Sequence, residues 1–322
     1  MIHYVIRRLL LSVLLLLAAS LMAFLILKAT PGDYFAMLQA DPRIPQEYVE
    51  AMRAEYGLDR PIHVQYGMWL SNAVRGDFGY SFAYKQPVSN VIGTRLLNTL
   101  ILNICAITLT WFIAIPVGVY AAVRQYSLRD KVLSGVSFVG MSLPSFFSAL
   151  LLLYLFASVL DVLPPGGLYS VQFPQMSAGE KLADLARHLV IPVVVLALAA
   201  MASLQRITRG NMLEVLGQQY VSTARAKGLS ERQVVYKHAL RNALNPLITI
   251  FGYEFGALLS GSALLEIILD YPGLGSLMYT AVRSQDQFLV MGGFMMGACM
   301  LLAGNLLAEL ILAWVDPRIS YR

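Results

Sequence analysis

Apolar residues recur along the chain in six long runs separated by polar segments. Each run is long enough to cross the hydrocarbon core of a bilayer as a helix, which takes about 20 predominantly apolar residues. The first run follows Arg7 and Arg8 and is longer than the apolar core of a signal peptide, so we interpret it as a retained span. The six predicted spans are residues 9–27, 98–123, 132–160, 189–205, 246–269 and 288–315. The pattern therefore predicts an all-α polytopic membrane protein with six transmembrane helices and both termini on one side.

The distribution of lysine and arginine indicates the orientation of these spans. The N-terminus, the loops 124–131 and 206–241 and the C-terminal tail carry about 14 basic residues against roughly 4 acidic ones. The segments on the opposite side carry about 10 basic residues, which about 12 acidic residues offset. Because short cytoplasmic loops are enriched in lysine and arginine, we expect both termini to be cytoplasmic.

The longest segment on the predicted outer side is 28–95, and it contains two stretches with the pattern of short amphipathic helices. Residues 45–57 and 61–76 each begin with Pro and end with Gly, as short helices often do. The apolar positions that share a face are Tyr48, Val49, Met52 and Tyr56 in the first stretch, and Ile62, Tyr66, Trp69, Leu70 and Ala73 in the second. We expect 28–95 to be an extracytoplasmic loop whose surface helices pack on the outer membrane face.

The composition excludes several classes of protein. Hydrophobic residues make up 57% of the 322 residues and charged residues 13%, and the mean hydropathy is +0.63. Disordered, collagenous and disulfide-rich secreted chains do not have this balance. Cys105 and Cys299 lie within apolar runs, and we interpret them as small buried residues rather than a disulfide or a metal site. The net charge of +5 follows from membrane topology, because the basic residues form no cluster with aromatic residues that would indicate a nucleic-acid partner.

Motifs for an enzymatic reaction are absent from the sequence. No lysine directly follows a glycine, as a phosphate-binding P-loop requires, and the patterns HExxH, CxxC and GxSxG do not occur. The four histidines lie in different segments. We expect no catalytic residue and no cofactor or metal in this chain, so transport against a gradient would need an ion gradient or a separate ATPase chain.

The predicted cytoplasmic loop contains the signals of two helices joined by a sharp turn. Gly228 fits the left-handed residue that ends a helix, and Ser230 with Gln233 forms a capping box that begins the next one. The face predicted for the first helix consists of Leu213, Leu216, Tyr220 and Ala224. Basic amphipathic helices commonly lie on anionic lipid. The small Ala224, Ala226 and Gly228 instead favour close approach of another protein.

This loop resembles the EAA motif in permease subunits of the dipeptide/oligopeptide/nickel group of ABC importers. The resemblance covers essentially the whole chain, although Gln219 replaces the acidic residue that usually opens the motif. It is carried by Gln219-Tyr220-Val221-Ser222-Thr223-Ala224-Arg225-Ala226-Lys227-Gly228-Leu229-Ser230, His238-Ala239-Leu240-Arg241-Asn242-Ala243-Leu244-Asn245-Pro246, Pro31-Gly32-Asp33, Gly57-Leu58-Asp59-Arg60-Pro61, Leu143-Pro144-Ser145-Phe146, Tyr271-Pro272-Gly273-Leu274-Gly275 and Asp316-Pro317-Arg318-Ile319.

The resemblance implies a single permease domain over 1–322 with the MetI-like fold, whose coupling (EAA) loop is 206–243. The residues that it assigns to contact with an ATPase are Gln219, Tyr220, Ala224, Arg225, Ala226, Lys227, Gly228, Leu229 and Ser230. It implies as partners a second homologous permease, two ABC ATPase subunits that hold ATP and Mg, an extracytoplasmic solute-binding protein and membrane lipid, in a bacterial or archaeal cytoplasmic membrane. The cargo implied is a di- or oligopeptide, with nickel or a metal chelate as the alternative.

A translocation path is predicted from polar residues within the apolar runs. Thr99, Asn103 and Thr110 form a stripe on the second predicted span, which either packs against other helices or lines the path. Glu254 is the best acidic candidate for the path, ahead of Glu266 and Glu309. The remaining alternatives are a secondary transporter that uses Glu254 as its proton site and a structural membrane anchor. Inverted repeats and broken midplane helices, which the first would need, are not evident, and an anchor leaves the cytoplasmic helix pair unexplained.

One further local feature is Pro144, which lies near the middle of the third predicted span. Proline removes a backbone donor and should kink this helix beside Ser142 and Ser145.

Overall fold

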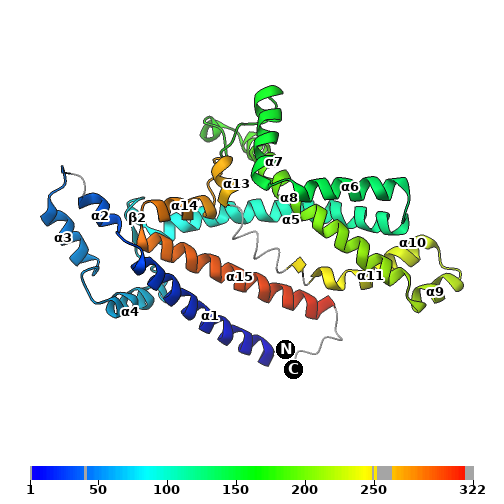
Figure 1. Cartoon of the computed structure of the whole chain (residues 1–322), viewed down its shortest axis with the longest axis horizontal. Coiled ribbons are helices and arrows are strands. Elements are labelled where there is room, and N and C mark those ends of the chain that lie inside the picture. Colours follow the sequence, from blue (N-terminus) through cyan, green and yellow to red (C-terminus); the bar gives the residue numbers. More distant parts are fainter. Residues whose placement is uncertain (1, 40–41, 249, 252–262, 316–322) are drawn as a thin grey trace. The chain divides into compact units, whose positions relative to one another are not determined.

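The computed structural model describes residues 2–39, 42–248, 250–251 and 263–315, and in this part the chain is almost entirely helical (Figure 1). It divides into two compact units. The first consists of Met1–Thr99 and Pro272–Leu302, and the second of Leu100–Tyr271 and Ala303–Arg322. Two helices, α5 (Val88–Val123) and α15 (Gln287–Val315), begin in the first unit and end in the second.

The first unit contains a long N-terminal helix, several short helices and a two-stranded antiparallel ribbon in which Tyr80 pairs with Pro87 and Ser81 with Gln86. Besides the starts of α5 and α15, its elements are α1 (Ile2–Ala29), α2 (Tyr34–Gln39), α3 (Gln46–Glu55), α4 (Ile62–Ala73), β1 (Tyr80–Ser81), β2 (Gln86–Pro87) and α14 (Leu274–Arg283).

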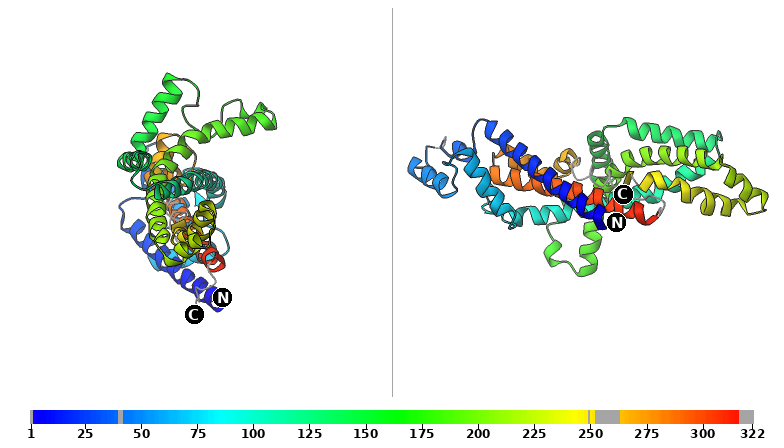
Figure 2. Two further views of the ribbon diagram at one scale, coloured as in Figure 1. Left: turned by 90° about the vertical axis from the view of Figure 1, so that its right-hand side faces the viewer. Right: turned by 90° about the horizontal axis from the view of Figure 1, so that it is seen from below.

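The second unit is built around one long helix, α8, beside which α6 lies in all the views (Figures 1 and 2). Besides the ends of α5 and α15, its elements are α6 (Leu128–Ser142), α7 (Ser145–Leu152), the π-helix η1 (Leu153–Val159), the 3-10 turn η2 (Phe173–Gln175), α8 (Ala178–Leu216), α9 (Gln219–Ala226), α10 (Glu231–Gln233), the π-helix η3 (Val234–Ala239), α11 (Leu240–Ala243) and α13 (Ala263–Ile268).

Four stretches of the described chain are long and apolar enough to span a membrane, and they confirm four of the predicted spans. These stretches are Ile6–Gln39, Val88–Val123, Ala178–Leu216 and Gln287–Leu307. Several of these helices extend beyond the predicted ends, because the polar residues that flank the apolar run are also helical. The fifth predicted span, 246–269, falls partly on residues 249 and 252–262, which lie outside the described residues.

The third predicted span is broken rather than kinked. Leu128–Ser142 and Ser145–Val159 meet at 100°. Leu143 is extended, with φ −84° and ψ 125°, and Pro144 precedes the first turn of α7. The residue before a proline is disfavoured in the helical region, so one helix ends before Pro144 and another begins after it. The prediction of a kink within one continuous helix was therefore wrong, because Pro144 separates two helices.

Two short helices, α3 and α4, form at the places predicted within the segment 28–95, whereas its position outside the membrane stays a prediction. Gly57 ends the first helical stretch with φ +66°, and Val49 on α3 is buried against Phe35 and Phe82. Trp69 on α4 packs with Phe24 and Met291. The two helices are thus held to the rest of the first unit by their own apolar faces.

Helix packing in the second unit depends on a close approach of α5 to α8. A Cβ at Gly118 would lie 2.7 Å from the Cβ of Thr208 and 2.9 Å from the carbonyl oxygen of Gln205. Only glycine leaves room for this contact. Elsewhere, Cys105 is partly buried and Cys299 is exposed, both as free thiols, so the prediction that Cys299 is a buried residue was wrong.

Candidate functional site

The segment after α8 folds back as an elbow, which we define as residues 217–243 (Figures 1 and 2). Helix α8 ends at Leu216, Gln218 is extended with φ −75° and ψ 149°, and α9 begins at Gln219. The predicted continuous face from residue 213 to 224 is therefore interrupted. Because the chain changes direction at Gln218, Tyr220 is exposed, and Val221 takes the buried position.

The turn of the elbow contains the predicted signals, a glycine that ends one helix and a capping box that begins the next. Gly228 has φ +77°, a conformation that residues with a Cβ rarely adopt. The backbone N–H of Ser230 donates to Oε1 of Gln233 at 3.3 Å, and the N–H of Gln233 donates to Oγ of Ser230 at 3.4 Å. This reciprocal capping box confirms that a second helix begins directly after the turn.

The two arms of the elbow enclose a small apolar core of their own. Val221 and Ala224 from α9 pack with Val234, and Val215 and Leu216 at the end of α8 contact the same cluster. Ala224 is only 6% exposed, so it lies inside the elbow and not on the open face predicted for it. A larger side chain there would separate the arms, which is why a small residue fits this position.

The second arm contains a π-helix, η3, between α10 and α11. Its buried residues Val235 and Ala239 pack with Val119 of α5 and Met212 of α8. In addition, Nδ2 of Asn211 donates to the carbonyl oxygen of Ala243 at 3.4 Å. The elbow is therefore anchored on the ends of two helices long enough to span a membrane.

Two side-chain contacts fasten the arms together. Arg225 donates to both carboxylate oxygens of Glu231, and Asn242 donates through Nδ2 to the hydroxyl of Tyr220 at 2.7 Å. The guanidinium of Arg225 lowers the pKa of Glu231, and the carboxylate raises the pKa of Arg225 in return. Sequence analysis missed Glu231 and Asn242, because their partners become neighbours only when the turn closes.

The outward face of the elbow consists of exposed residues. Val221 and Ala224 mark the side of α9 that faces the second arm, so residues about half a turn away point outward. Of the predicted coupling residues only Ala224 is buried. Tyr220 and Arg225 are exposed but engaged in the contacts between the arms, and the other exposed ones are Gln219, Ala226, Lys227, Gly228, Leu229 and Ser230. No atom lies within 4 Å of a Cβ built at Gly228 in the described part of the chain. The small residues Ala226, Gly228 and Ser230 leave this face low at the turn, between the longer side chains of Lys227 and Leu229.

An ion pair joins α6 to α8 near the base of the elbow. Nε of Arg209 donates to Oδ1 of Asp130 at 2.8 Å, and Nη2 donates to Oδ2 at 2.9 Å. The Asp130 side chain is 4% exposed, and it also accepts a hydrogen bond from the N–H of Tyr126. Sequence analysis missed this pair, since its residues are far apart in the chain and only the packing of α6 on α8 brings them together.

The residues predicted to line a translocation path differ in the contacts that they make. Thr99, Asn103 and Thr110 are all buried on α5. The hydroxyl of Thr99 accepts a hydrogen bond from the N–H of Leu274 at 2.7 Å, which fixes the start of α14. Both polar atoms of Asn103 lack a hydrogen-bond partner among the described residues. Glu254, the main acidic candidate, lies outside the described residues, so its role stays a prediction.

The remaining acidic candidates, Glu266 and Glu309, lie on α13 and α15 respectively. Glu266 is completely buried, and Glu309 is partly buried. The backbone carbonyl of Glu266 accepts a hydrogen bond from the N–H of Tyr271 at 2.7 Å, and the roles of both carboxylates stay predictions.

Comparison with known proteins places the chain in a family. Residues 1–103 match the N-terminal part of the binding-protein-dependent transport system membrane component, and residues 114–321 match the binding-protein-dependent transport system inner membrane component. The oligopeptide transport system permease protein AppB of Bacillus subtilis is 42% identical over 99% of both chains. A putative peptide permease of Brucella ovis is 38% identical over 99% of both chains, and the glutathione transport system permease GsiC of Escherichia coli is 34% identical over 100% of both.

Among solved structures, a chain of the inward-facing methionine ABC transporter MetNI is similar in fold. The TM-score is 0.54 at 18% identity, and the match covers 70% of this chain and 96% of that chain. This confirms the predicted all-α permease fold. Since the family matches cover nearly the whole sequence, the chain belongs to the binding-protein-dependent transport system inner membrane components and is a multi-pass permease subunit of an ABC importer.

Proposed function

We propose that this permease carries peptides across the cytoplasmic membrane in an importer driven by ATP. The observation that supports the cargo is the set of relatives that match over nearly their whole length, which are named for oligopeptides, peptides and glutathione. These names favour a peptide over nickel or a metal chelate. Membership of an ABC importer family also argues against the alternative hypothesis of an ion-gradient transporter.

The complex that we propose contains a second homologous permease, two ATPase subunits that bind ATP and Mg, and an extracytoplasmic solute-binding protein. Both termini and the elbow face the cytoplasm in this proposal, and the segment 28–95 faces outward. The excess of basic residues around the elbow supports this orientation.

Coupling to the ATPase is assigned to the outward face of the elbow. Ala226 and Leu229 offer small and apolar contact, and Lys227 offers a charge. The arms behind this face are fastened by their apolar core and by the contacts of Arg225 and Tyr220. A force applied to the face by a closing ATPase would therefore move the ends of α5 and α8 rather than deform the elbow.

The experiment is a bulky substitution on the outward face. Ala226→Trp leaves the buried face of α9 intact, so the chain should fold but fail to seat its ATPase. We expect ATP-driven uptake of a labelled tripeptide into proteoliposomes to fall by roughly tenfold or more, which corresponds to about 1.4 kcal/mol of lost coupling. Co-purification of the ATPase subunits should fall with it.

The matched control is Ala51→Trp, an exposed position on α3 in the segment assigned to the other side of the membrane. It should leave association with the ATPase unchanged. Normal uptake by Ala226→Trp would overturn the assignment of the elbow. Failure of the wild-type complex to take up any peptide, with ATP hydrolysis intact, would overturn the proposed cargo.

A further inference from the structure

The second unit contains a groove of about 220 Å³ that lies between α6 and α8 and is separate from the elbow. Its lining residues all belong to these two helices. Those of α6 fall within the predicted span 132–160, and those of α8 lie at the end of the predicted span 189–205 and just beyond it. In the orientation that we propose, the groove is therefore at the cytoplasmic boundary of the membrane.

The floor of the groove is closed, whereas its rim is accessible. Ala202 and Gln205 form the floor and are both buried, and Oγ of Ser137 donates to Oε1 of Gln205 at 2.9 Å across the two helices. On the rim, Phe138 is 58% exposed and Met141 is 41% exposed. A ligand would therefore contact the side chains of the rim and rest on a packed floor.

The groove changes from apolar to basic along its length. Helices α6 and α8 run antiparallel, because Ser137 contacts Gln205 whereas the earlier Asp130 contacts the later Arg209. Positions 202 and 209 are about 10 Å apart along the axis of α8, at 1.5 Å per residue. The apolar end consists of Phe138, Met141 and Ala202, and the basic end consists of Arg206 and Arg209.

The basic end carries one positive charge without a partner. Arg209 is paired with Asp130, as described above. The guanidinium of Arg206 is exposed and makes no hydrogen bond or ion pair with the residues that the structure describes. Its N–H donors are therefore available to an anion, which a planar guanidinium binds well when the anion is a phosphate.

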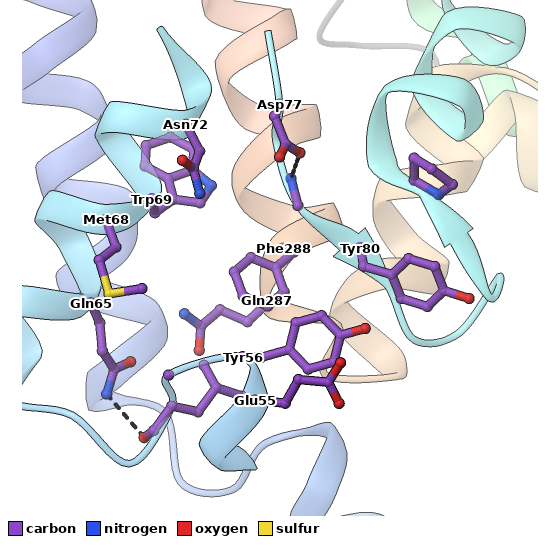
Figure 3. A pocket seen from close by; sticks show the side chains of 14 residues that line it. Glu55, Tyr56, Gln65, Met68, Trp69, Asn72, Asp77, Tyr80, Gln287 and Phe288 are labelled. Atoms are coloured by element: carbon purple, nitrogen blue, oxygen red, sulfur yellow. Dashed lines mark hydrogen bonds between the residues drawn. The ribbon is translucent and has the colours of Figure 1, made fainter. Parts of the chain in front are cut away.

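The larger cavity of the first unit, about 400 Å³ in volume, has a different character. Figure 3 shows aromatic and carboxylate side chains around it, among them Tyr56, Tyr80 and Glu55. Its lining, as far as the structure describes it, contains no lysine, arginine or histidine. Since opposite charges attract, an anion fits the groove between α6 and α8 rather than this cavity.

We propose that the groove binds an anionic phospholipid of the inner leaflet. The phosphate pairs with the guanidinium of Arg206 beside Arg209, and an acyl chain lies along Phe138 and Met141. A free phosphate would occupy only the basic end, because the apolar end favours hydrocarbon. The choice of leaflet rests on the proposed function, whereas a ligand with an anionic head and an apolar tail follows from the groove alone.

The test is photocrosslinking in the complete permease and ATPase assembly, reconstituted in phosphatidylcholine nanodiscs. The probe is phosphatidylglycerol with a diazirine on one acyl chain, and peptide mass spectrometry measures labelling of the α6 segment that contains Phe138 and Met141. We expect stronger labelling than with phosphatidylcholine that carries the same chain. Arg206→Gln should lower the labelling by about fivefold, the contribution of one basic residue beside an anionic membrane surface. Arg206→Lys should retain most of it.

The matched control is Arg187→Gln, which makes the same change at an exposed position of α8 away from the groove. It should be labelled like the wild type, and thermal unfolding should show that all the variants fold. Equal labelling by the two lipids, or wild-type labelling of Arg206→Gln, would overturn the inference. Loss of labelling in excess inorganic phosphate would show a site for small anions instead. Labelling of the isolated chain but not of the assembly would show that a partner subunit covers the groove, which also overturns the inference.

The outcome is separable from the proposed function. Labelling needs no transport, and a nanodisc presents both leaflets to the probe. If ATP-driven peptide uptake is normal but phosphatidylglycerol is not preferred, only the lipid site fails. If no peptide is taken up while labelling depends on Arg206 as expected, the proposed cargo fails and the lipid site stands.

Discussion

Arg225 and Glu231 are joined across the turn of the elbow by two hydrogen bonds, from Nε to Oε2 at 3.2 Å and from Nη2 to Oε1 at 2.7 Å. The pair connects the end of α9 to the start of α10. Arg225 precedes Gly228 in the chain and Glu231 follows it, and the φ of +77° at Gly228 reverses the chain direction between them. A bidentate contact of this kind restricts the angle between the arms more than a single hydrogen bond would.

The stability contributed by this pair should depend on pH. Since Arg225 lowers the pKa of Glu231 in the folded protein, the contribution is present above the usual pKa of a glutamate and is lost as the pH falls through the lowered value. Near pH 7, Arg225→Gln should lower the free energy of unfolding by about 0.2–1 kcal/mol, because the pair is exposed.

Thermal unfolding of the purified chain at several pH values measures this effect. At a pH below the lowered pKa of Glu231 the wild type and Arg225→Gln should differ little, since the carboxylate is then protonated in both. Lys237→Gln, an exposed basic position on the same elbow, should show no such dependence. A difference between Arg225→Gln and wild type that is independent of pH would contradict the prediction.

The contact between α5 and α8 predicts opposite effects for two glycines of the same helix. Gly118→Ala would place a Cβ against Thr208 and the backbone of Gln205, so it should destabilise the protein by about 1–3 kcal/mol. Gly93→Ala meets no atom within 4 Å in the described chain and should be neutral or stabilise by up to about 1 kcal/mol through higher helix propensity. Thermal unfolding in detergent compares the two, and equal effects would argue against the close approach.

The pair Asp130–Arg209 should be far more sensitive to substitution than Arg225–Glu231. Asp130→Asn leaves a partly buried guanidinium without its counter-charge, and about 3–5 kcal/mol of stability should be lost. Arg209→Lys should not restore the wild type, because an ammonium group cannot make the two parallel hydrogen bonds. The midpoint of thermal unfolding and the yield of assembled complex measure the loss. A wild-type midpoint for Arg209→Lys would show that the bidentate geometry is unimportant.

Asn103 offers a test that separates stability from transport. Its amide is completely buried without a hydrogen-bond partner in the part of the chain that the structure describes, so Asn103→Leu should leave stability unchanged or raise it by about 1–3 kcal/mol. Peptide uptake should nevertheless fall if the side chain lines the path as predicted. Unchanged uptake with raised stability would remove Asn103 from the predicted path.

For comparison, Thr99→Val removes the acceptor for the N–H of Leu274. This change should destabilise the protein by about 1–2 kcal/mol, because a buried donor loses its partner. Thr99→Val should thus lower the unfolding midpoint, whereas Asn103→Leu on the same helix should leave it unchanged or raise it.

Local signals in the sequence were sufficient for much of the architecture. The apolar runs identified the long helices α1, α5, α8 and α15, because about 20 apolar residues are stable as a helix in a bilayer whatever surrounds them. Gly228 and the capping box of Ser230 defined the elbow, since each acts on the backbone within a few residues.

The sequence by itself also determined the family, through motifs that extend over the whole chain. Only the tertiary structure decided which side chains of the elbow face inward and which face a partner. The break at Gln218 moved Tyr220 outward and left Ala224 inside, although helical periodicity placed both on one face. The contacts of Glu231, Asn242 and Asp130 depend on segments that meet only after folding. Periodicity describes one helix at a time, whereas these contacts arise from the packing of several.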